Sequence, residues 1–587
     1  MIFAKDLESL TFPAVLKSSV AKFGGKVALS FVNSNSLTYN EVASRAAQLS
    51  KILTVLGIKK GDKVALYSTS TPQWGVAYFA IVNIGAIAVP LLPDFTTKEI
   101  ERMTQHAGVS GIIVGDKLLK RLDTIPEALL PFVIRISDFT VLRKNGKNSD
   151  EDVKIDMHTK NLPDVPTVKI EEQDTASIIY TSGTTGRSKG VELTHKNLIW
   201  CAIQTQTMHR VNKLDRCLSF LPLSHVYEFT LGFVMQFLNG SSVFYLERAP
   251  TISTLLPALK KIRPTLILSV PVIMEKIYKN KIIPTFTKTE QLKKLYNIRF
   301  FQKIMHYFAG KSLKKTFGGN IKFFGIGGAK LDPVVERFLK DAKFPYAIGY
   351  GLTETSPLLA GTGPKNSIPG TIGPVMRGVD MKIINSDPVT HVGEVVVKGE
   401  NVMKGYYKEP EMTAAVFTTK DDECGEGYFK TGDLGLLHNG IWLELKGRLK
   451  NMILGSGGEN IYPEDIEFVL NQHPDVSESL VVEDDSGLVA LVQLNEEKKK
   501  PFLQQAADAA GRIGEDIAYN RTALMGEIKF YVNEQVNKFS KIARVQMVED
   551  FEKTASQKIK RYLYNFRNKD SNIDSEKKEK DSLKKDK

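Results

Sequence analysis

Hydrophobic and polar positions in the first part of the chain follow helix and strand periods in turn. A helix is expected to open within Leu37–Glu41 and to run to Leu56, where Gly57 can end it. The apolar run Lys63–Tyr67 then predicts a buried strand, and helix and strand keep alternating through Gly111–Gly115. This rhythm is typical of an α/β domain with a largely parallel sheet.

One apolar window in this region is about long enough to cross a bilayer. Gly75–Leu92 carries no charge. We interpret it as two buried elements, a helix from Pro72 to about Ile84 and a strand Ala86–Val89 that Pro90 stops. Asn83 in the middle of the window also disfavours a hydrocarbon environment. The pattern therefore predicts core packing and not a membrane span.

The remainder of the chain divides by composition. Residues 139–172 are charged and broken by prolines, which indicates a surface connection. Residues 279–318 predict a helical insertion rich in lysine and aromatic residues, and 462–562 predict a small α+β domain. The segment 527–539 of that domain predicts an amphipathic helix, with one side formed by Ile528, Val532, Val536 and Phe539. Residues 566–587 have alternating charges and little apolar content, so we expect disorder.

The densest chemical signal is the segment Tyr180–Gly190, which joins two predicted strands, Ala176–Tyr180 and Val191–His195. It contains a cluster of hydroxyl residues, three glycines and Lys189. Glycine lets successive N–H groups converge on an anion, and hydroxyl and lysine donors suit phosphate oxygens. A plain turn is the simplest alternative, and the pattern of a Walker loop is absent. The number of donors favours a polyphosphate site.

The totals limit the class of protein. A chain of 587 residues needs two or more domains, and 42% apolar residues suit a folded soluble protein. The three cysteines, Cys201, Cys217 and Cys424, have no metal-binding spacing and make no disulfide framework, which favours a reducing cytoplasm. The first residues include acidic side chains and lack an apolar core, so they do not form a signal peptide.

Seven short sequence motifs follow one another along the chain. They are Tyr180–Gly190, Phe220–Glu228, Lys322–Leu331, Gly349–Thr355, Tyr428–Gly435, Gly447–Ile461 and Glu552–Arg561. Together they resemble the adenylate-forming superfamily of acyl-CoA synthetases, firefly luciferase and the adenylation domains of peptide synthetases, over residues from about 35 to 562. The resemblance implies an α/β fold with a large N-terminal domain of doubly wound sheets, residues 1–447. It also implies a small mobile α+β lid, 448–565, with its hinge at Lys450, followed by the charged tail 566–587.

The resemblance also implies a nucleotide site. Its phosphate contacts would come from Thr181, Ser182, Gly183, Thr184, Thr185, Gly186 and Lys189, and its other contacts from Gly328, Ala329, Tyr350, Gly351, Thr353, Asp433 and Arg448. Within this set, the turn with Gly328 flanks adenine, Tyr350 stacks on it, and Asp433 binds the ribose hydroxyls. Taken alone, Gly349–Thr355 could be a glycine turn with an exposed Glu354, the Gly-Asp pair at Asp433 could be a common turn, and Glu552–Arg561 could be a basic surface turn.

By the same resemblance, four residues carry the chemistry. Thr353 contacts the α-phosphate, Glu354 holds Mg²⁺, His225 lies beside the acyl carboxylate and Lys558 neutralises charge during adenylation. Taken alone, the segment around His225 could be a helix start capped by Ser224. Coenzyme A would pass Gly457 and Gly458. Gln557 departs from the glycine that the family usually has beside this lysine.

Three segments look most similar to those of long-chain fatty acyl-CoA synthetases: residues 220–228, residues 266–278 and the insertion 279–318. The implied reaction uses ATP to make an acyl-adenylate and transfers the acyl group to coenzyme A, releasing AMP and pyrophosphate. The alternatives are a ligase that loads acyl groups onto a carrier protein, and a ligase that acts on medium-chain or aromatic acids. A third alternative is a nucleotide-binding relic or scaffold without activity. The insertion could act at a membrane or at the acyl tunnel, but a solvated helical hairpin is the more usual outcome.

The formal charge of +13 could indicate nucleic acid as a partner. However, the chain has neither a basic face interleaved with aromatics nor a nucleic-acid motif. ATP, coenzyme A and an anionic membrane surface explain the charge equally well. We therefore expect a cytoplasmic enzyme, with the inner face of the membrane as an alternative location.

Overall fold

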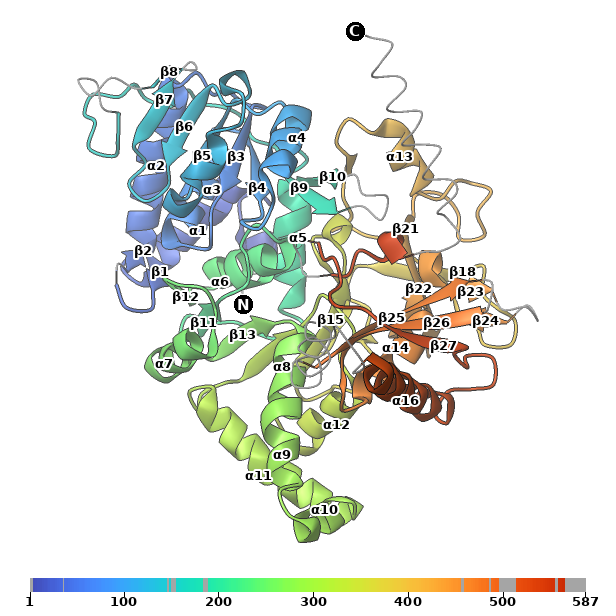
Figure 1. Cartoon of the computed structure of the whole chain (residues 1–587). Helices are drawn as coiled ribbons and strands as arrows, with labels where there is room; N and C mark the ends of the chain where they lie inside the picture. Colours follow the sequence, from blue (N-terminus) through green and yellow to red (C-terminus); the bar gives the residue numbers. More distant parts are fainter. Residues whose placement is uncertain are drawn as a thin grey trace.

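The chain folds into a large body of packed sheets and helices with a smaller domain against one side (Figure 1). The computed structural model describes residues 4–34, 36–144, 147–148, 155–182, 188–454, 459–484, 487–495, 514–554 and 558–564. Near its N-terminus the chain forms the turn η1 (Ala4–Asp6) and the helix α1 (Phe12–Phe23).

The first sheet has nine strands in the order β20-β10-β9-β4-β3-β5-β6-β7-β8. The five strands from β9 to β6 are parallel, and the strands at both edges are antiparallel. Their bounds are β3 Lys63–Tyr67, β4 Ile87–Leu91, β5 Gly111–Val114, β6 Phe132–Arg135, β7 Val141–Lys144, β8 Lys147–Asn148, β9 Thr175–Ser182, β10 Ser188–Thr194 and β20 Gly405–Tyr406. The predicted parallel core of this domain is confirmed.

The second sheet has eight strands in the order β16-β15-β14-β13-β11-β12-β1-β2, and the six from β15 to β1 are parallel. Their bounds are β1 Val27–Phe31, β2 Leu37–Thr38, β11 Arg216–Ser219, β12 Ser242–Tyr245, β13 Leu266–Ser269, β14 Phe323–Ile326, β15 Tyr346–Gly351 and β16 Leu358–Gly361. Strand β10 of the first sheet leads directly into helix α5 (His195–Thr205).

Helix α3 (Pro72–Asn83) explains the uncharged window. Nearly every side chain along it is buried, and Trp74 and Phe79 pack against Phe229 and Phe233 of the π-helical turn η4 (Glu228–Val234). A helix that is apolar on all sides belongs in the interior. Gly85 has φ +72° and ends the segment, as expected. Among the helices in the described ranges, none has the length and apolar character needed to cross a membrane.

The remaining helices and turns of the large body complete its layers. They are α2 (Tyr39–Val55), α4 (Thr97–Ala107), η2 (Asp116–Leu122), η3 (Glu127–Leu129), α6 (Met235–Leu238), α7 (Ile252–Ile262), α12 (Pro333–Asp341), η6 (Thr353–Thr355) and α13 (Pro410–Ala415). Helix α2 starts as the sequence predicts, because Thr38 and Glu41 form a reciprocal capping box. Gly57 follows its end with φ +88°.

Two local predictions were wrong. Strand β4 does not stop at Pro90 but continues to Leu91, with Pro90 opposite Leu66 of β3. Strand β9 pairs with β4 only at Ala88, so the sheet requires no N–H from Pro90 on that side. Residues 139–172 are not simply a surface connection, since β7 extends the first sheet beside β6.

The chain then forms an antiparallel five-stranded sheet in the order β17-β22-β21-β19-β18. Its strands are β17 Gly373–Pro374, β18 Asp380–Ile384, β19 Gly393–Lys398, β21 Phe429–His438 and β22 Trp442–Arg448. The turn η7 (Leu449–Asn451) follows β22, and the short pair β23 (Ile453–Leu454) and β24 (Asn460–Ile461) leads into the smaller domain.

The smaller domain is α+β, as predicted. Helices α14 (Pro463–Gln472) and α16 (Gly514–Asn533) pack on the sheet β25 (Val476–Asp484), β26 (Gly487–Leu494) and β27 (Arg544–Met547), and η8 (Arg561–Tyr564) ends the described chain. The predicted helix 527–539 was wrong in its limits, because α16 starts earlier and ends at Asn533. Ile528 and Val532 are fully buried, whereas Phe539 lies beyond the helix and is 47% exposed. Residues 566–587, expected to be disordered, lie outside the described residues.

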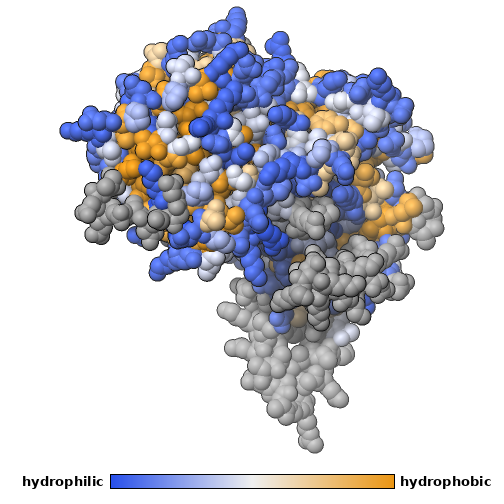
Figure 2. All heavy atoms as spheres, turned by 90° about the horizontal axis from the view of Figure 1, so that it is seen from above, coloured by the Kyte–Doolittle hydropathy of each residue, from blue (hydrophilic) through white to orange (hydrophobic). Residues whose placement is uncertain are grey.

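The predicted helical insertion is present. It comprises α8 (Pro271–Ile277), the π-helical turn η5 (Tyr278–Ile282), α9 (Ile283–Phe286), α10 (Glu290–Tyr296) and α11 (Arg299–Thr316). Figure 1 shows α9, α10 and α11 extending from the body at its lower end, with α10 at the tip. Seen from above, the molecule presents mainly hydrophilic residues with several hydrophobic areas between them (Figure 2).

Candidate active site

One continuous cleft of about 4190 Å³ runs through the molecule. It is lined by the ends of strands from both large sheets, by the chain around β21 and β22, by α14 of the smaller domain and by the insertion. Ligands of open α/β sheets bind at the carboxyl ends of the strands. The residues predicted from sequence can therefore be located relative to one site.

The predicted phosphate segment is the tip of a hairpin. Strands β9 and β10 pair antiparallel with Thr181 opposite Lys189. Gly183, Thr184, Thr185 and Gly186 lie outside the described residues, as does the side chain of Ser182. The Lys189 ammonium lies 4.7 Å from the ring centroid of Tyr406, and burial together with Lys450 lowers its pKa, opposed by Glu354. Lys189 and Glu354 therefore face the same part of the cleft.

Glu354 lies in η6, directly after β15. The Tyr406 hydroxyl donates a hydrogen bond to its Oε1 at 3.0 Å, and the Met403 N–H donates to its backbone carbonyl at 2.8 Å. The structure describes no cluster of three or more His, Cys, Asp or Glu side chains that could hold a metal alone. A single carboxylate fits Mg²⁺, which takes its other ligands from phosphates and water. The sequence analysis assigned no role to Tyr406, because no local pattern around this residue indicates a contact with Glu354.

Asp433 is the centre of a second cluster. The Tyr350 hydroxyl donates to its Oδ2 at 2.7 Å, and Arg448 Nε lies 3.1 Å from its Oδ1. Strands β21 and β22 place Asp433 directly opposite Arg448. Burial raises the pKa of Asp433, and Arg448 and the Tyr350 hydrogen bond oppose that shift. Three residues predicted from separate strings thus meet at one point of the cleft.

The glycine turn after β14 borders the same space. Gly328 has φ +86° and an ideal Cβ there would have only Val270 as a neighbour, at 3.8 Å, so the turn is open at this position. An ideal Cβ at Gly327 would lie 3.2 Å from the ring of Tyr227. Ala329 and Gly351 also line the cleft. A planar group can approach the backbone at Gly328, whereas the Tyr227 ring occupies the corresponding space at Gly327.

His225 precedes the π-helical turn η4. The Tyr227 N–H donates to its Nδ1 at 3.3 Å, so the neutral ring carries its proton on Nε2. Burial and the nearby Lys558 lower the pKa of His225 to about 4. Ser224 does not cap this helix, since its hydroxyl has no hydrogen-bond partner within the described part of the chain. At neutral pH His225 is therefore an uncharged donor.

The carboxyl group of Glu228 lies in the wall beside His225. The residue is 1% exposed, and neither carboxyl oxygen has a hydrogen-bond partner among the described residues. Burial raises its pKa to about 8. Desolvation of the charged form accounts for this shift, so the group is mostly protonated at neutral pH. The sequence string contained Glu228 but gave no reason to single it out.

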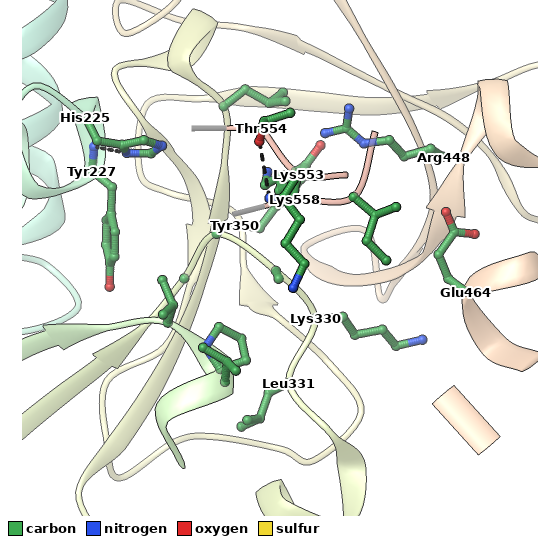
Figure 3. A pocket seen from close by; sticks show the side chains of 18 of the residues that line it. His225, Tyr227, Lys330, Leu331, Tyr350, Arg448, Glu464, Lys553, Thr554 and Lys558 are labelled. Carbon is green, nitrogen blue, oxygen red and sulfur yellow. Dashed lines mark hydrogen bonds between the residues drawn. The ribbon is translucent and has the colours of Figure 1, made fainter. Parts of the chain in front are cut away.

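Lys558 comes from the smaller domain and enters the cleft. Figure 3 shows its side chain pointing into the pocket, with His225 on one side and Arg448 and Glu464 on the other. The Lys558 N–H donates to the Thr554 hydroxyl at 3.2 Å. Desolvation by the surrounding protein and the charge of Arg448 lower the pKa of Lys558, while the charges of Asp433 and Glu354 oppose that shift. Thr353, of η6, lines the same cleft.

Contacts that the sequence did not indicate hold this arrangement together. Three residues after Lys558, the half-buried Arg561 guanidinium donates to both carboxyl oxygens of Glu467 at 2.6 and 2.5 Å. Lys330 Nζ lies 2.9 Å from Asp465 Oδ1, and Lys279 Nζ donates to the Val476 carbonyl at 2.7 Å. The last two contacts join the large body to the smaller domain. Only their basic or acidic character was visible in the sequence.

The predicted hinge residue Lys450 lies in η7, between β22 and the smaller domain. Its charge is close enough to that of Lys189 to lower the pKa of Lys189. The predicted coenzyme A residues Gly457 and Gly458 lie outside the described residues. Cys201, Cys217 and Cys424 are free.

Comparison with known proteins agrees with this picture. Residues 16–407 match the family described as AMP-binding enzyme, and the chain belongs to that family. It is 28% identical to Long-chain-fatty-acid–CoA ligase FadD15 of Mycobacterium bovis over 89% of this chain and 90% of that protein. It is 29% identical to Long-chain-fatty-acid–CoA ligase of Bacillus subtilis over 81% and 83%, and 26% identical to 4-coumarate–CoA ligase 1 of Solanum tuberosum over 90% and 88%.

Solved structures share the fold. The ATP-bound RpMatB-BxBclM chimera B1 superimposes with a TM-score of 0.74 at 23% identity, covering 96% of this chain and 99% of that one. O-succinylbenzoate coenzyme A synthetase of Bacillus subtilis, in complex with ATP and magnesium ion, gives 0.71 at 22% identity, covering 93% and 98%. The predicted superfamily and fold class are confirmed.

Proposed function

We propose that this protein is an AMP-forming acid–CoA ligase whose substrate is a long-chain fatty acid. The observation that carries the proposal is the convergence of Lys558, Glu354 and the Asp433–Arg448 pair on one cleft, from both the large body and the smaller domain. The names of its relatives support ligation of a carboxylic acid to coenzyme A.

The proposed first half-reaction is attack of a carboxylate oxygen on the α-phosphorus of ATP. The new O–P bond forms as the bond to pyrophosphate breaks, and charge develops on the phosphoryl oxygens. Preorganised cations and donors lower the barrier of such a step. Lys558, Lys189 and the Thr353 hydroxyl would supply them, and the neutral His225 would orient the substrate carboxylate by donating from Nε2.

The remaining residues would hold the nucleotide. Asp433 has both oxygens directed to donors and could accept ribose hydroxyls in their place, with Tyr350 and the turn at Gly328 beside the base. Bound Mg²⁺ would neutralise phosphate charge, with Glu354 as its protein ligand. The hydrogen bond from Tyr406 would fix the orientation of that carboxylate.

The second half-reaction would require another arrangement of the domains. The sulfur of coenzyme A attacks the acyl carbonyl carbon, and AMP leaves with the electron pair of the broken bond. We propose that residues 448–565 then rotate about Lys450, withdrawing Lys558 and bringing Gly457 and Gly458 to the cleft. A hinge of one or two residues at a domain boundary suits such a motion.

The choice of a long-chain acid is supported by the relatives and by the insertion. Two relatives are named as long-chain fatty acid ligases, and the cleft continues to α10 and α11 of the insertion. The relative named 4-coumarate–CoA ligase keeps an aromatic acid as the second candidate. The membrane surface where long-chain acids reside is a proposed peripheral partner, and the cytoplasm is the proposed compartment.

The test is pyrophosphate release from ATP with straight-chain acids of graded length and with 4-coumarate, with and without coenzyme A. Each further buried CH₂ contributes about 0.8 kcal/mol, so kcat/KM should rise steeply with length before it levels off. Coenzyme A should convert slow release into turnover. Preference for 4-coumarate would reject the long-chain assignment, and release of no pyrophosphate with any acid would reject the enzyme itself.

A further inference from the structure

Helix α11 has two apolar faces. Its inner face packs on α12: His306 Nδ1 lies 3.0 Å from Asp341 Oδ2, and an ideal Cβ at Gly310 would lie 2.1 Å from the Ala342 carbonyl oxygen. Such close backbone contact, together with the paired contacts of Arg299 Nη1 and Nη2 with Asp341 at 2.8 and 3.0 Å, fixes the helix on the body. The opposite face consequently points away from the protein.

That opposite face is aromatic. The outer face of α11 is formed by Phe300, Phe301, Ile304, Tyr307, Phe308 and Lys311, which are all exposed. Phe300, Ile304 and Tyr307 are spaced by four and three residues and thus share one side of the helix. Phe300 is 68% exposed and Phe308 is 62% exposed. A surface helix normally places polar residues there, and a cluster of this kind marks an interaction surface.

The charge around the outer face indicates the occupant. Between Glu290 and Thr316 the chain has six lysines and one arginine but one acidic residue, a net charge of +6. Lys311 lies 4.7 Å from the ring centroid of Tyr307, and Lys343 lies 5.6 Å from it. Aromatic side chains interleaved with lysines on an exposed helix suit the interface of an anionic bilayer, where rings enter the headgroup region and ammonium groups meet lipid phosphates.

We propose that the outer face of α11 docks the protein on anionic lipid membranes. The inner side of α10 and α11 lines the cleft, which favours a membrane over a soluble partner. Tyr296 of α10 and Gln302 of α11 line the cleft that contains the candidate active site. Docking by the outer face therefore holds the end of the cleft that these helices line close to the bilayer. This reason for a membrane rests on the proposed function, whereas the docking surface itself does not.

The experiment is cosedimentation of the full chain with vesicles of phosphatidylcholine alone or of equal parts phosphatidylcholine and phosphatidylglycerol, at low and high salt. Binding is expected only with the anionic vesicles and should weaken with salt. The Phe300→Ser/Phe308→Ser variant should bind about tenfold more weakly, since it loses two interfacial rings. Lys311→Glu/Lys315→Glu should bind weakly at either salt concentration.

Matched controls alter similar residues elsewhere. Phe530→Ser changes an equally exposed phenylalanine of α16, and Lys365→Glu/Lys420→Glu reverses two exposed lysines of the large body. All of these should bind like the unaltered protein. Pyrophosphate release with a short water-soluble acid should stay the same in the Phe300→Ser/Phe308→Ser variant, which verifies its fold, while release with palmitate presented in anionic vesicles should fall.

Two results would overturn the inference. One is equal binding by the Phe300→Ser/Phe308→Ser variant, or no binding to any vesicle. The other is a dimer of the unaltered protein that this variant converts to monomer without any vesicle binding, which would assign the face to a second copy of the chain. Either result leaves the proposed ligase standing if pyrophosphate release persists, so the two failures are distinguishable.

Discussion

At the scale of single residues, one charge governs the proposed adenylation. Lys558 projects into the cleft from the smaller domain, among Arg448, Asp433 and Glu354. Desolvation by the protein around it and the neighbouring Arg448 guanidinium lower its pKa, because both disfavour the ammonium form, although the side chain remains partly exposed. The group remains useful to adenylation only while it is protonated.

The first prediction concerns the pH dependence of adenylation. Lys558 is protonated below its lowered pKa and loses its charge as the pH rises through it, so pyrophosphate release should decline at a pH below the ordinary lysine value of about 10.4. Lys558→Arg should move this decline to higher pH, because guanidinium stays protonated. The measurement is pyrophosphate release without coenzyme A across the alkaline range.

Lys558→Ala is the companion variant. It should lower adenylation by roughly two to three orders of magnitude, the scale expected for loss of one charge-stabilising donor. Thioester formation from supplied acyl-adenylate should be spared. Equal loss in both half-reactions would contradict the proposed hinge motion, and an unchanged alkaline decline in Lys558→Arg would assign it to another group.

At the scale of elements, strand ends and pairings bring the chemistry together. The end of β15 leads into η6 and Glu354, and the β21–β22 pairing sets Asp433 opposite Arg448. Lys558 has no strand of its own. It lies in a turn closed by the Lys553–Ile559 bridge, and the half-buried pair between Arg561 and Glu467 ties that segment to α14.

The second prediction removes that tie. Arg561→Met should lower adenylation by roughly tenfold to a hundredfold, because small displacements of a catalytic group are costly. It should also destabilise the smaller domain by about 3–5 kcal/mol, since the buried Glu467 loses its charge partner and keeps the hydrogen bond from the Val481 N–H. Pyrophosphate release and chemical denaturation measure the two effects.

A double variant separates positioning from stability. Arg561→Met/Glu467→Leu should recover much of the stability but not the adenylation rate. Arg544→Met is the control, because it breaks an ion pair with Asp484 that is half-exposed and worth about 0–1 kcal/mol. Full adenylation activity in Arg561→Met would show that this pair does not position Lys558.

At the scale of the whole molecule, polar contacts among the described residues join the smaller domain to the large body. They include the Lys330–Asp465 ion pair and the hydrogen bond from Lys279 to the Val476 carbonyl. Both partners of the ion pair are about half-exposed, at 49% and 50% of their side chains. A pair of this kind contributes little to stability, but it would bias the proposed equilibrium between two domain arrangements.

The third prediction follows from that balance. Asp465→Ala should lower adenylation by a factor of up to about five, the equivalent of 1 kcal/mol, with thermal stability unchanged. The effect should shrink at high salt and be partly restored by Lys330→Asp/Asp465→Lys. Glu8→Ala, which breaks the exposed pair with Lys17, is the control and should have no effect. Loss of thioester formation to the same extent would contradict a contact specific to the closed arrangement.

Much of the fold could be predicted because its signals are local. The capping box of Thr38 and Glu41, the strand at Lys63–Tyr67 and the hairpin around Lys189 each follow from a few neighbouring residues. The failures also have local causes. Pro90 continues β4 because the neighbouring strand pairs elsewhere, and α16 ends before Phe539, which a periodic pattern alone included.

The sequence by itself determined the order of the elements, the strings of the candidate site and the basic, aromatic character of the insertion. Only the tertiary structure decided which side chains meet. The Tyr350 hydroxyl reaches Asp433 across 83 residues, Tyr406 orients Glu354, and Lys558 enters through a domain contact. It also decided that the second apolar face of α11 remains uncovered, because Gly310 commits the other face to α12. Propensity and periodicity act over a few residues, whereas these contacts arise from the packing of distant segments, which no local pattern encodes.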